Sequence, residues 1–106
     1  MICAQFIFKP GTYDDDFYRL DAQIDQYARS LPGFEKVETW QSAEGDIINA
    51  VYYFADKKAL AQLSQFPQHR EAQGQVERWY DGYRIIVSEI TATYGDGRLP
   101  DLGATT

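Results

Sequence analysis

The chain has 106 residues, the usual size of a single domain with one hydrophobic core. Its composition, 44% hydrophobic and 25% charged, is typical of a folded protein and excludes a disordered chain. The net charge of −6 argues against nucleic acid as a partner, and the single cysteine, Cys3, leaves nothing to pair with in a disulfide. No segment approaches the roughly 20 apolar residues of a membrane helix. We therefore expect a cytoplasmic protein that binds neither nucleic acid nor membranes.

The first third of the chain predicts a strand followed by a helix. Residues 2–9 are rich in β-branched and aromatic side chains and are followed by a Pro-Gly turn. Thr12 and Asp15 have the spacing of a capping box, which predicts a helix start near residues 14–16. Pro32 and Gly33 end this helix. Its apolar residues recur on one face, and they are Phe17, Leu20, Ile24, Tyr27, Ala28 and Leu31.

The rest of the chain predicts two strands, a helix, a strand and a tail. Residues 34–42 and 47–54 have the composition of an antiparallel pair joined by a hairpin. Asp56 predicts the start of a second helix that bends at Pro67 and ends at Gly82. A fourth strand is expected at 83–94. The prediction is thus one domain over residues 1–94 and a loose tail over 95–106.

The element order β-α-β-β-α-β predicts an α+β protein of the ferredoxin-like class. In this fold a four-stranded antiparallel sheet carries both helices on one face. Residues 2–9 and 47–54 are nevertheless apolar on both sides, and two helices cannot cover both faces. We therefore expect a homodimer in which two sheets pack face to face around a barrel-like interior, with the tail crossing to the partner. The alternative is a monomer whose aromatic side chains cap an open sheet.

Four short stretches carry a resemblance to a known family. They are residues 31–34 (LPGF), Trp40, residues 49–53 (NAVYY) and residues 66–70 (FPQHR). Over residues 2–94 the chain resembles the antibiotic biosynthesis monooxygenase-like proteins of the dimeric α+β barrel superfamily. The resemblance implies a small hydrophobic or aromatic ligand between sheet and helices. It also implies oxygen insertion into a polyketide-like or quinol-like substrate without flavin, metal or haem. Active members have an Asn early in the first strand, where this chain has Gln5 as its only amide.

Such chemistry requires polar groups that stabilise a substrate anion in a dry pocket. We expect the pocket between the sheet and the second helix, reached by Asn49 or Trp40 from the strands and by His69 or Trp79 from the helix. The catalytic candidates are Asn49, His69 and Trp79, and the substrate-binding candidates are Trp40, Tyr52, Tyr80 and Arg84.

Each of these candidates also has a structural interpretation. His69 could be a helix-start histidine bonded to the backbone, and the two tryptophans could be packing residues. Asn49 could make a hydrogen bond within the sheet or an interface, and Arg84 could form a surface ion pair. A lone histidine without a second ligand does not predict a metal site.

Two other functions remain open. The first is a non-catalytic dimeric barrel that binds a small ligand. The second is a haem-binding and haem-degrading monooxygenase, because the resemblance extends to a branch in which a His follows Ala in the second helix. Here Gln73 follows Ala72, and His69 lies one turn earlier. We expect that haem is not the natural ligand, since an amide is a poor axial ligand for iron.

Overall fold

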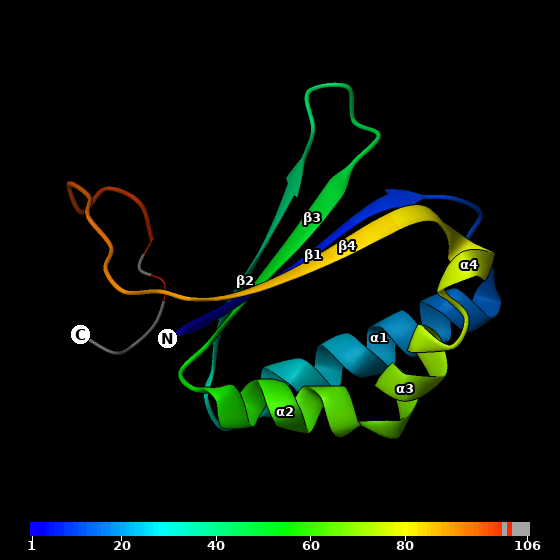
Figure 1. Ribbon diagram of the computed structural model, residues 1–106, viewed down its shortest axis with the longest axis horizontal. Helices are drawn as coiled ribbons and strands as arrows, with labels where there is room; N and C mark the ends of the chain where they lie inside the picture. Colours follow the sequence, from blue (N-terminus) through cyan, green and yellow to red (C-terminus); the bar gives the residue numbers. More distant parts are fainter. Residues whose placement is uncertain (101, 103–106) are drawn as a thin grey trace.

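A computed structural model describes residues 1–100 and 102. The four strands form one antiparallel sheet in the order β2-β3-β1-β4, and the helices all lie on one face of it (Figure 1). The predicted α+β class and ferredoxin-like order are therefore confirmed. The elements are β1 (Ile2–Pro10), α1 (Asp15–Ser30), β2 (Phe34–Gln41), β3 (Ile48–Phe54), α2 (Lys57–Gln65), α3 (Pro67–Gln73), α4 (Val76–Trp79) and β4 (Tyr80–Glu89). Within the described residues, no helix has the length and apolar character needed to cross a membrane.

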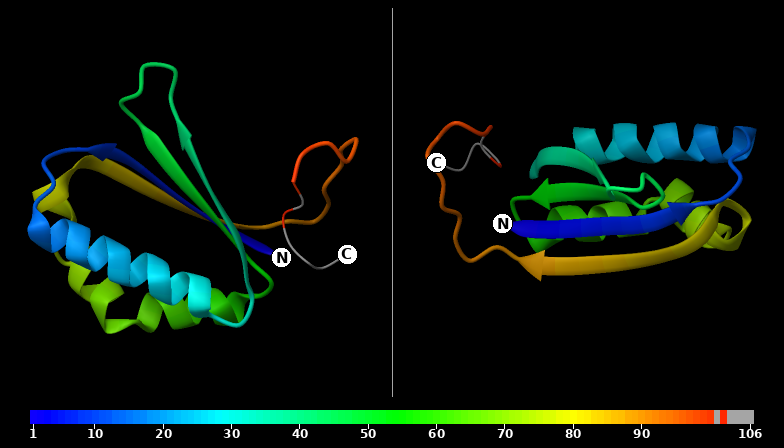
Figure 2. Two further views of the ribbon diagram at one scale, coloured as in Figure 1. Left: turned by 180° about the vertical axis from the view of Figure 1, so that it is seen from behind. Right: turned by 90° about the horizontal axis from the view of Figure 1, so that it is seen from above.

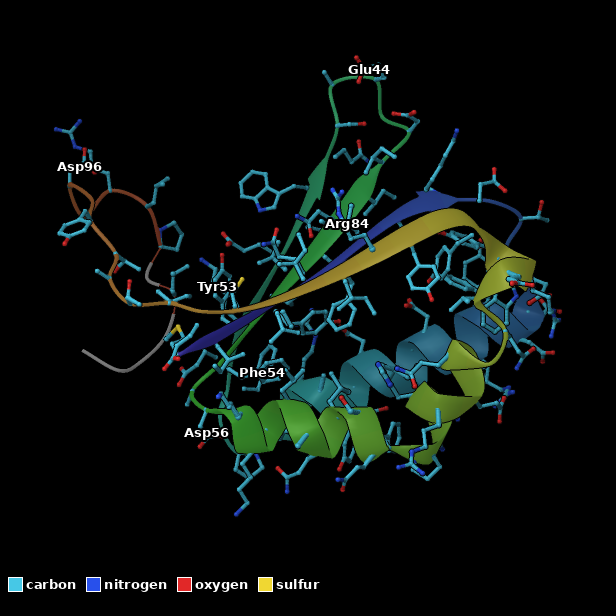
Figure 3. The ribbon with its side chains drawn as sticks, viewed as in Figure 1. Glu44, Tyr53, Phe54, Asp56, Arg84 and Asp96 are labelled. Carbon is cyan, nitrogen blue, oxygen red and sulfur yellow. The ribbon has the colours of Figure 1, made fainter. Side chains whose placement is uncertain are left out.

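The strand register divides the sheet residues between a helix-covered face and an open face. Ala4 pairs with Tyr52 on β3 and with Val87 on β4, so these three side chains share the helix-covered face. Side chains alternate along each strand, and Figure 3 shows Phe54 pointing toward the helices and Tyr53 pointing away. The open face carries alternate residues, among them Cys3, Gln5, Ile7, Asn49, Val51, Arg84 and Ile86.

The core consists of two apolar clusters under the helices. One joins β1 and β3 to α1 and α2 and has Phe54 and Leu63 as its largest members. The other joins α1 to α4 through Phe17, Leu20 and Trp79. The apolar face predicted for the first helix is confirmed, because all six of its residues are buried or packed against these clusters.

The prediction of one long bent second helix is wrong. The chain forms three helices instead, because Phe66 is extended (φ −62°, ψ 127°) and α3 starts afresh at Pro67. A residue before proline disfavours the helical region, and proline cannot donate the hydrogen bond that would continue the previous helix. A second interruption follows at Gly74, the C-cap of α3.

The last strand also starts and ends earlier than the sequence pattern predicts. β4 begins at Tyr80, directly after α4, and ends at Glu89. Gly82, predicted as the glycine that ends the second helix, instead pairs with Lys9 within the sheet. The helical spacing of Ala72, Val76, Trp79 and Tyr80 runs across three elements, α3, α4 and β4, which hydrophobic spacing alone does not separate.

The first helix is capped by Asp14 and not by the predicted Thr12 and Asp15 pair. The Asp14 Oδ1 atom accepts a hydrogen bond of 2.9 Å from the backbone N–H of Phe17, which is the usual N-cap geometry. The same oxygen accepts a 3.0 Å hydrogen bond from the indole N–H of Trp79, and the second oxygen lies 2.6 Å from Arg78. One carboxylate thus joins the start of α1 to α4.

The segment after β4 leaves the sheet at the end where the N-terminus lies (Figure 1), and Figure 2 shows the same from two other directions. Ile90 still donates a backbone hydrogen bond to Met1, at 2.9 Å. Beyond it, Tyr94 and Leu99 are almost fully exposed. Of the predicted tail, residues 101 and 103–106 lie outside the described residues.

Candidate functional site

A pocket of about 300 Å³ lies between the sheet and helices α1, α3 and α4. It occupies the space between the two core clusters, since its walls include members of both. Its position matches the expected place between the sheet and the second helical segment. Most of the wall is apolar and largely aromatic, and it includes Phe6, Phe8, Phe17, Leu20, Leu63 and Val76.

Five of the seven predicted site residues contribute to this wall. They are Tyr52, His69, Trp79, Tyr80 and Arg84. The β4 register, however, puts the Arg84 side chain on the open face, and Figure 3 shows it on the side of the sheet away from the helices. Arg84 therefore does not place its guanidinium group inside the pocket.

Asn49 and Trp40 do not line the pocket, so the expectation that they reach it from the strands is wrong for this pocket. Asn49 pairs with Ile7 and Trp40, and all three lie on the open face. The Asn49 side-chain N–H donates a 2.9 Å hydrogen bond to Gln5, while its Oδ1 atom is buried without a partner among the described residues. Trp40 is 59% exposed. The period-2 alternation of strands separates these residues from Tyr52.

Two of the polar groups at the pocket already have hydrogen-bond partners inside the protein. Trp79 uses its only donor, the indole N–H, on Asp14. The Tyr52 hydroxyl donates to Asp25 at 3.1 Å, and burial together with the nearby Asp25 charge raises the pKa of Tyr52 above its usual range. Both side chains therefore serve the pocket mainly as aromatic wall.

His69 lies on α3 with its Nδ1 atom buried and without a partner among the described residues. We considered that His69 could be a helix-start histidine bonded to the backbone. Only its main chain makes such a bond, because its backbone N–H donates to the Phe66 carbonyl at 3.0 Å. Burial lowers the pKa of His69 below 6.5, so the ring is neutral at pH 7. A neutral imidazole next to a pocket can accept or donate a proton.

Tyr80 and Asp21 add two more polar groups to the wall. Burial raises the pKa of the Tyr80 phenol, so the hydroxyl stays protonated at neutral pH and can donate a hydrogen bond. Sequence analysis missed Asp21. Its spacing in the sequence could have identified it, because Asp21 lies four residues after Phe17 and three before Ile24. This spacing places a carboxylate on the apolar face of α1.

Gln73, the residue at which the resemblance would place an axial histidine for haem, also lines the pocket. Its amide fits an iron ligand poorly, whereas His69 is an imidazole one turn away in the same wall. Across residues 1–100 and 102, no group of three or more His, Cys, Asp or Glu side chains is arranged to hold a metal ion.

The protein is thus an α+β protein with a largely apolar pocket between the sheet and the helices. Several solved structures share its fold. No protein-family model matches the chain, and no curated protein does either. SnoaB, a cofactor-independent oxygenase from Streptomyces nogalater, is 10% identical with a TM-score of 0.69, and the match covers 90% of this chain and 97% of SnoaB. A putative antibiotic biosynthesis monooxygenase from Deinococcus radiodurans is 11% identical with a TM-score of 0.70, covering 91% and 98%.

A putative antibiotic biosynthesis monooxygenase from Nitrosomonas europaea is 14% identical with a TM-score of 0.66, and the match covers 87% of this chain and all of that one. The identities are low, so the likeness establishes a shared fold. The chain has the fold of the proteins that it was predicted to resemble.

Proposed function

We propose that this protein is a cofactor-independent monooxygenase that acts on a small aromatic, polyketide-like or quinol-like molecule bound in the pocket. The observation that carries this proposal is a buried, unpartnered Nδ1 atom of His69 at an aromatic pocket of about 300 Å³. An imidazole with an unpartnered ring nitrogen can act as a proton acceptor for a molecule in the pocket. The shared fold with SnoaB and the two putative monooxygenases supports the same proposal.

In the proposed reaction, His69 removes a proton from the bound aromatic and leaves an electron-rich anion. The Tyr80 hydroxyl stabilises the negative oxygen of that anion as a hydrogen-bond donor. Dioxygen then takes electrons from the substrate, one oxygen atom forms a new carbonyl in the product and the other leaves as water. The substrate supplies the electrons, and the aromatic wall, which includes Trp79, excludes bulk water and orients the ring.

Oxygen uptake with a panel of quinols and anthrone-like phenols tests this proposal. We expect uptake by the wild type, and a loss of about 10²-fold or more in His69→Ala and in Tyr80→Phe, with the fold intact. Trp40→Phe on the open face is the matched control. Asn49→Ala tests the hypothesis that Asn49 is catalytic, and we expect it to keep its turnover. No uptake with any substrate, or uptake by the His69 and Tyr80 variants equal to that of the wild type, contradicts the enzyme proposal.

A second candidate is a protein that binds the same kind of molecule without transforming it. It is favoured by the internal use of the Trp79 and Tyr52 donors, which leaves few groups free to stabilise an anion. This function predicts saturable binding of an aromatic ligand with no oxygen uptake. The same substrate panel therefore separates the two candidates.

We also propose that the working form is a two-fold homodimer with sheets packed face to face. On the open face, Ile86 and Trp40 are 38% and 59% exposed, whereas Val51 and Cys3 are already buried within the chain. The unpartnered Asn49 Oδ1 lies on the same face. A second copy would cover these apolar groups and could supply a donor to the amide oxygen.

A further inference from the structure

The pocket contains one carboxylate whose charge is not matched by anything in its surroundings. Asp21, on α1, contributes to the wall together with His69 and Tyr80. Among residues 1–100 and 102, nothing donates a hydrogen bond to its side chain or forms an ion pair with it. Its carboxylate oxygens can therefore accept a hydrogen bond from a ligand in the pocket.

The neighbouring acid on the same helix shows the contrast. Asp25 accepts a 2.8 Å hydrogen bond from Arg29 and a 3.1 Å hydrogen bond from the Tyr52 hydroxyl. Its charge is therefore compensated within the protein. Asp21, one turn earlier, has neither partner and faces the negative charge of Asp25 as well.

The accessible surface of Asp21 is consistent with a place at the pocket. The residue is exposed, and it also belongs to the pocket wall, close enough to Tyr80 for its charge to affect that phenol. Burial, and then the charge of Asp25, raise the pKa of Asp21 above its usual value. Both effects disfavour the charged form of Asp21, and a ligand that donates a hydrogen bond to the carboxylate would stabilise that form.

No cationic head group enters the pocket to balance this charge. Arg84 is the only Lys or Arg in the described wall, and its side chain lies on the open face of the sheet. His69 is neutral at pH 7, because burial lowers its pKa. An anionic group of a ligand placed next to Asp21 would therefore be repelled by the carboxylate.

We propose that Asp21 determines the specificity of the pocket: its carboxylate accepts a hydrogen bond from a hydroxyl or ammonium group on an aromatic ligand, and it excludes ligands with an anionic group at that place. The proposal rests on the proposed function of the pocket as a site for small aromatics. A site that offers a charged acceptor discriminates through both the matched donor and the repelled anion.

Calorimetric titration at pH 7 with three naphthalene probes tests this specificity. The probes share one ring system and differ in charge: 2-naphthol is neutral, 2-naphthylmethylamine is cationic and 2-naphthoate is anionic. The matched pair of variants is Asp21→Asn and Asp15→Asn. Both lie on α1 and remove one negative charge, but Asp15 lies outside the pocket wall. Parallel NMR spectra of Trp40→Phe, which leaves Trp79 as the only tryptophan, report whether a probe enters the pocket.

We expect the neutral and cationic probes to bind at least about tenfold more tightly than 2-naphthoate, with a shift of the Trp79 indole signal. Asp21→Asn should weaken binding of the amine by about tenfold or more and bring 2-naphthoate close to 2-naphthol. Asp15→Asn should leave the ratios unchanged. If the probes bind but the two variants behave alike, or if 2-naphthoate binds most tightly to the wild type, the role of Asp21 is refuted while the pocket remains a ligand site. If no probe binds, both the proposed pocket function and this inference fail.

Discussion

The Asp14 side chain accepts hydrogen bonds from the start of α1 and from Trp79 at the end of α4, which is 65 residues away from Asp14 in the sequence. The sequence predicts acidic residues at this helix start, because negative charge is favourable near the amide groups of a first turn. It does not predict the contact with Trp79, since that depends on where α4 lies in the fold. A residue interpreted from sequence as a solvated helix start is therefore also a tertiary link.

Replacing Asp14 by alanine should lower the thermal midpoint by roughly 4–8 °C, the usual consequence of losing a helix cap in a domain of this size. The loss should exceed that of Asp15→Ala, because Asp15 has no side-chain hydrogen bond or ion pair among the described residues. Circular dichroism melting curves measure both. Equal midpoints for the two variants would contradict the link to α4.

The contribution of Asp14 should also depend on pH. The backbone N–H of Phe17, followed by contacts with Arg78 and Trp79, lowers the pKa of Asp14 below 3.8 in the folded protein. A group with a lowered folded pKa stabilises the protein above its unfolded value and loses that effect as the pH falls through the folded value. The difference in midpoint between wild type and Asp14→Ala should therefore be constant above about pH 5 and shrink below pH 3.8.

The residues His69 and Gln73 lead to a prediction about haem binding. Gln73 occupies the position at which the resemblance would place the axial histidine, so we expect hemin to bind weakly and without a defined stoichiometry. Titration of the purified protein with hemin, followed in the Soret region, measures this. A sharp Soret band at one haem per subunit that disappears in His69→Ala would show that His69 serves as the axial ligand instead.

At the scale of elements, α3 differs from the helices on either side of it. It runs between two breaks, at Phe66 and Gly74, and none of its residues is buried. Little tertiary packing therefore protects the backbone hydrogen bonds of α3, although this helix supplies His69 and Gln73 to the pocket. Sequence analysis identified Pro67 as a bend but could not place the second break, because Gly74 is tolerated within a helical pattern.

Hydrogen exchange should report this difference. We expect the backbone amides of α3 to exchange much faster than those of residues 17–28 in α1, where the apolar face is buried. A ligand in the pocket should slow exchange in α3 more than in α2, because α3 contributes more of the wall. Mass spectrometry with and without 2-naphthol makes the comparison. Equal protection of α1 and α3 in the free protein would be the contrary result.

At the scale of the whole molecule, the open face of the sheet leads to a prediction about assembly. Ile86 lies on this face in β4, opposite Gln5, and is 38% exposed. Ile86→Glu should place a charge in the proposed interface and convert the dimer to a monomer. Ala22→Glu, on the exposed surface of α1, makes the same change in charge away from that face and should remain dimeric.

Light scattering at micromolar concentration measures both variants and the wild type. A wild-type protein with the mass of one chain would refute the dimer. Removing residues 95–106 tests whether the tail takes part: if the tail crosses to the partner, as expected, the truncated protein should melt at a lower temperature. An unchanged midpoint would leave the sheet face alone as the interface.

The fold was largely predictable from this sequence, and the site only in part. Turn residues, β-branched runs and the spacing of Phe17, Leu20 and Ile24 are local signals, and they define the element order correctly. The position of the pocket follows from that order. Asn49 was grouped with Tyr52 although alternation along β3 already places the two residues on opposite faces. Which of these faces the helices cover depends on the packed fold. The spacing of Asp21 already places it on the apolar face of α1, but only the packed structure shows that it lines the pocket without a partner among the described residues.

The register also has a consequence for how this protein can change. In β1 and β3, the even-numbered positions face the helices and the odd-numbered positions face away, and in β4 this parity is reversed. Phe6, Phe8, Ala50 and Tyr52 are accordingly wall residues, while alternation directs the side chains of their immediate neighbours to the other surface, including that of Ile7, which also lines the pocket. Substitutions at one parity can reshape the cavity without altering the opposite surface. A single inserted or deleted residue within a strand, in contrast, would exchange the two sets beyond that point and alter both surfaces at once.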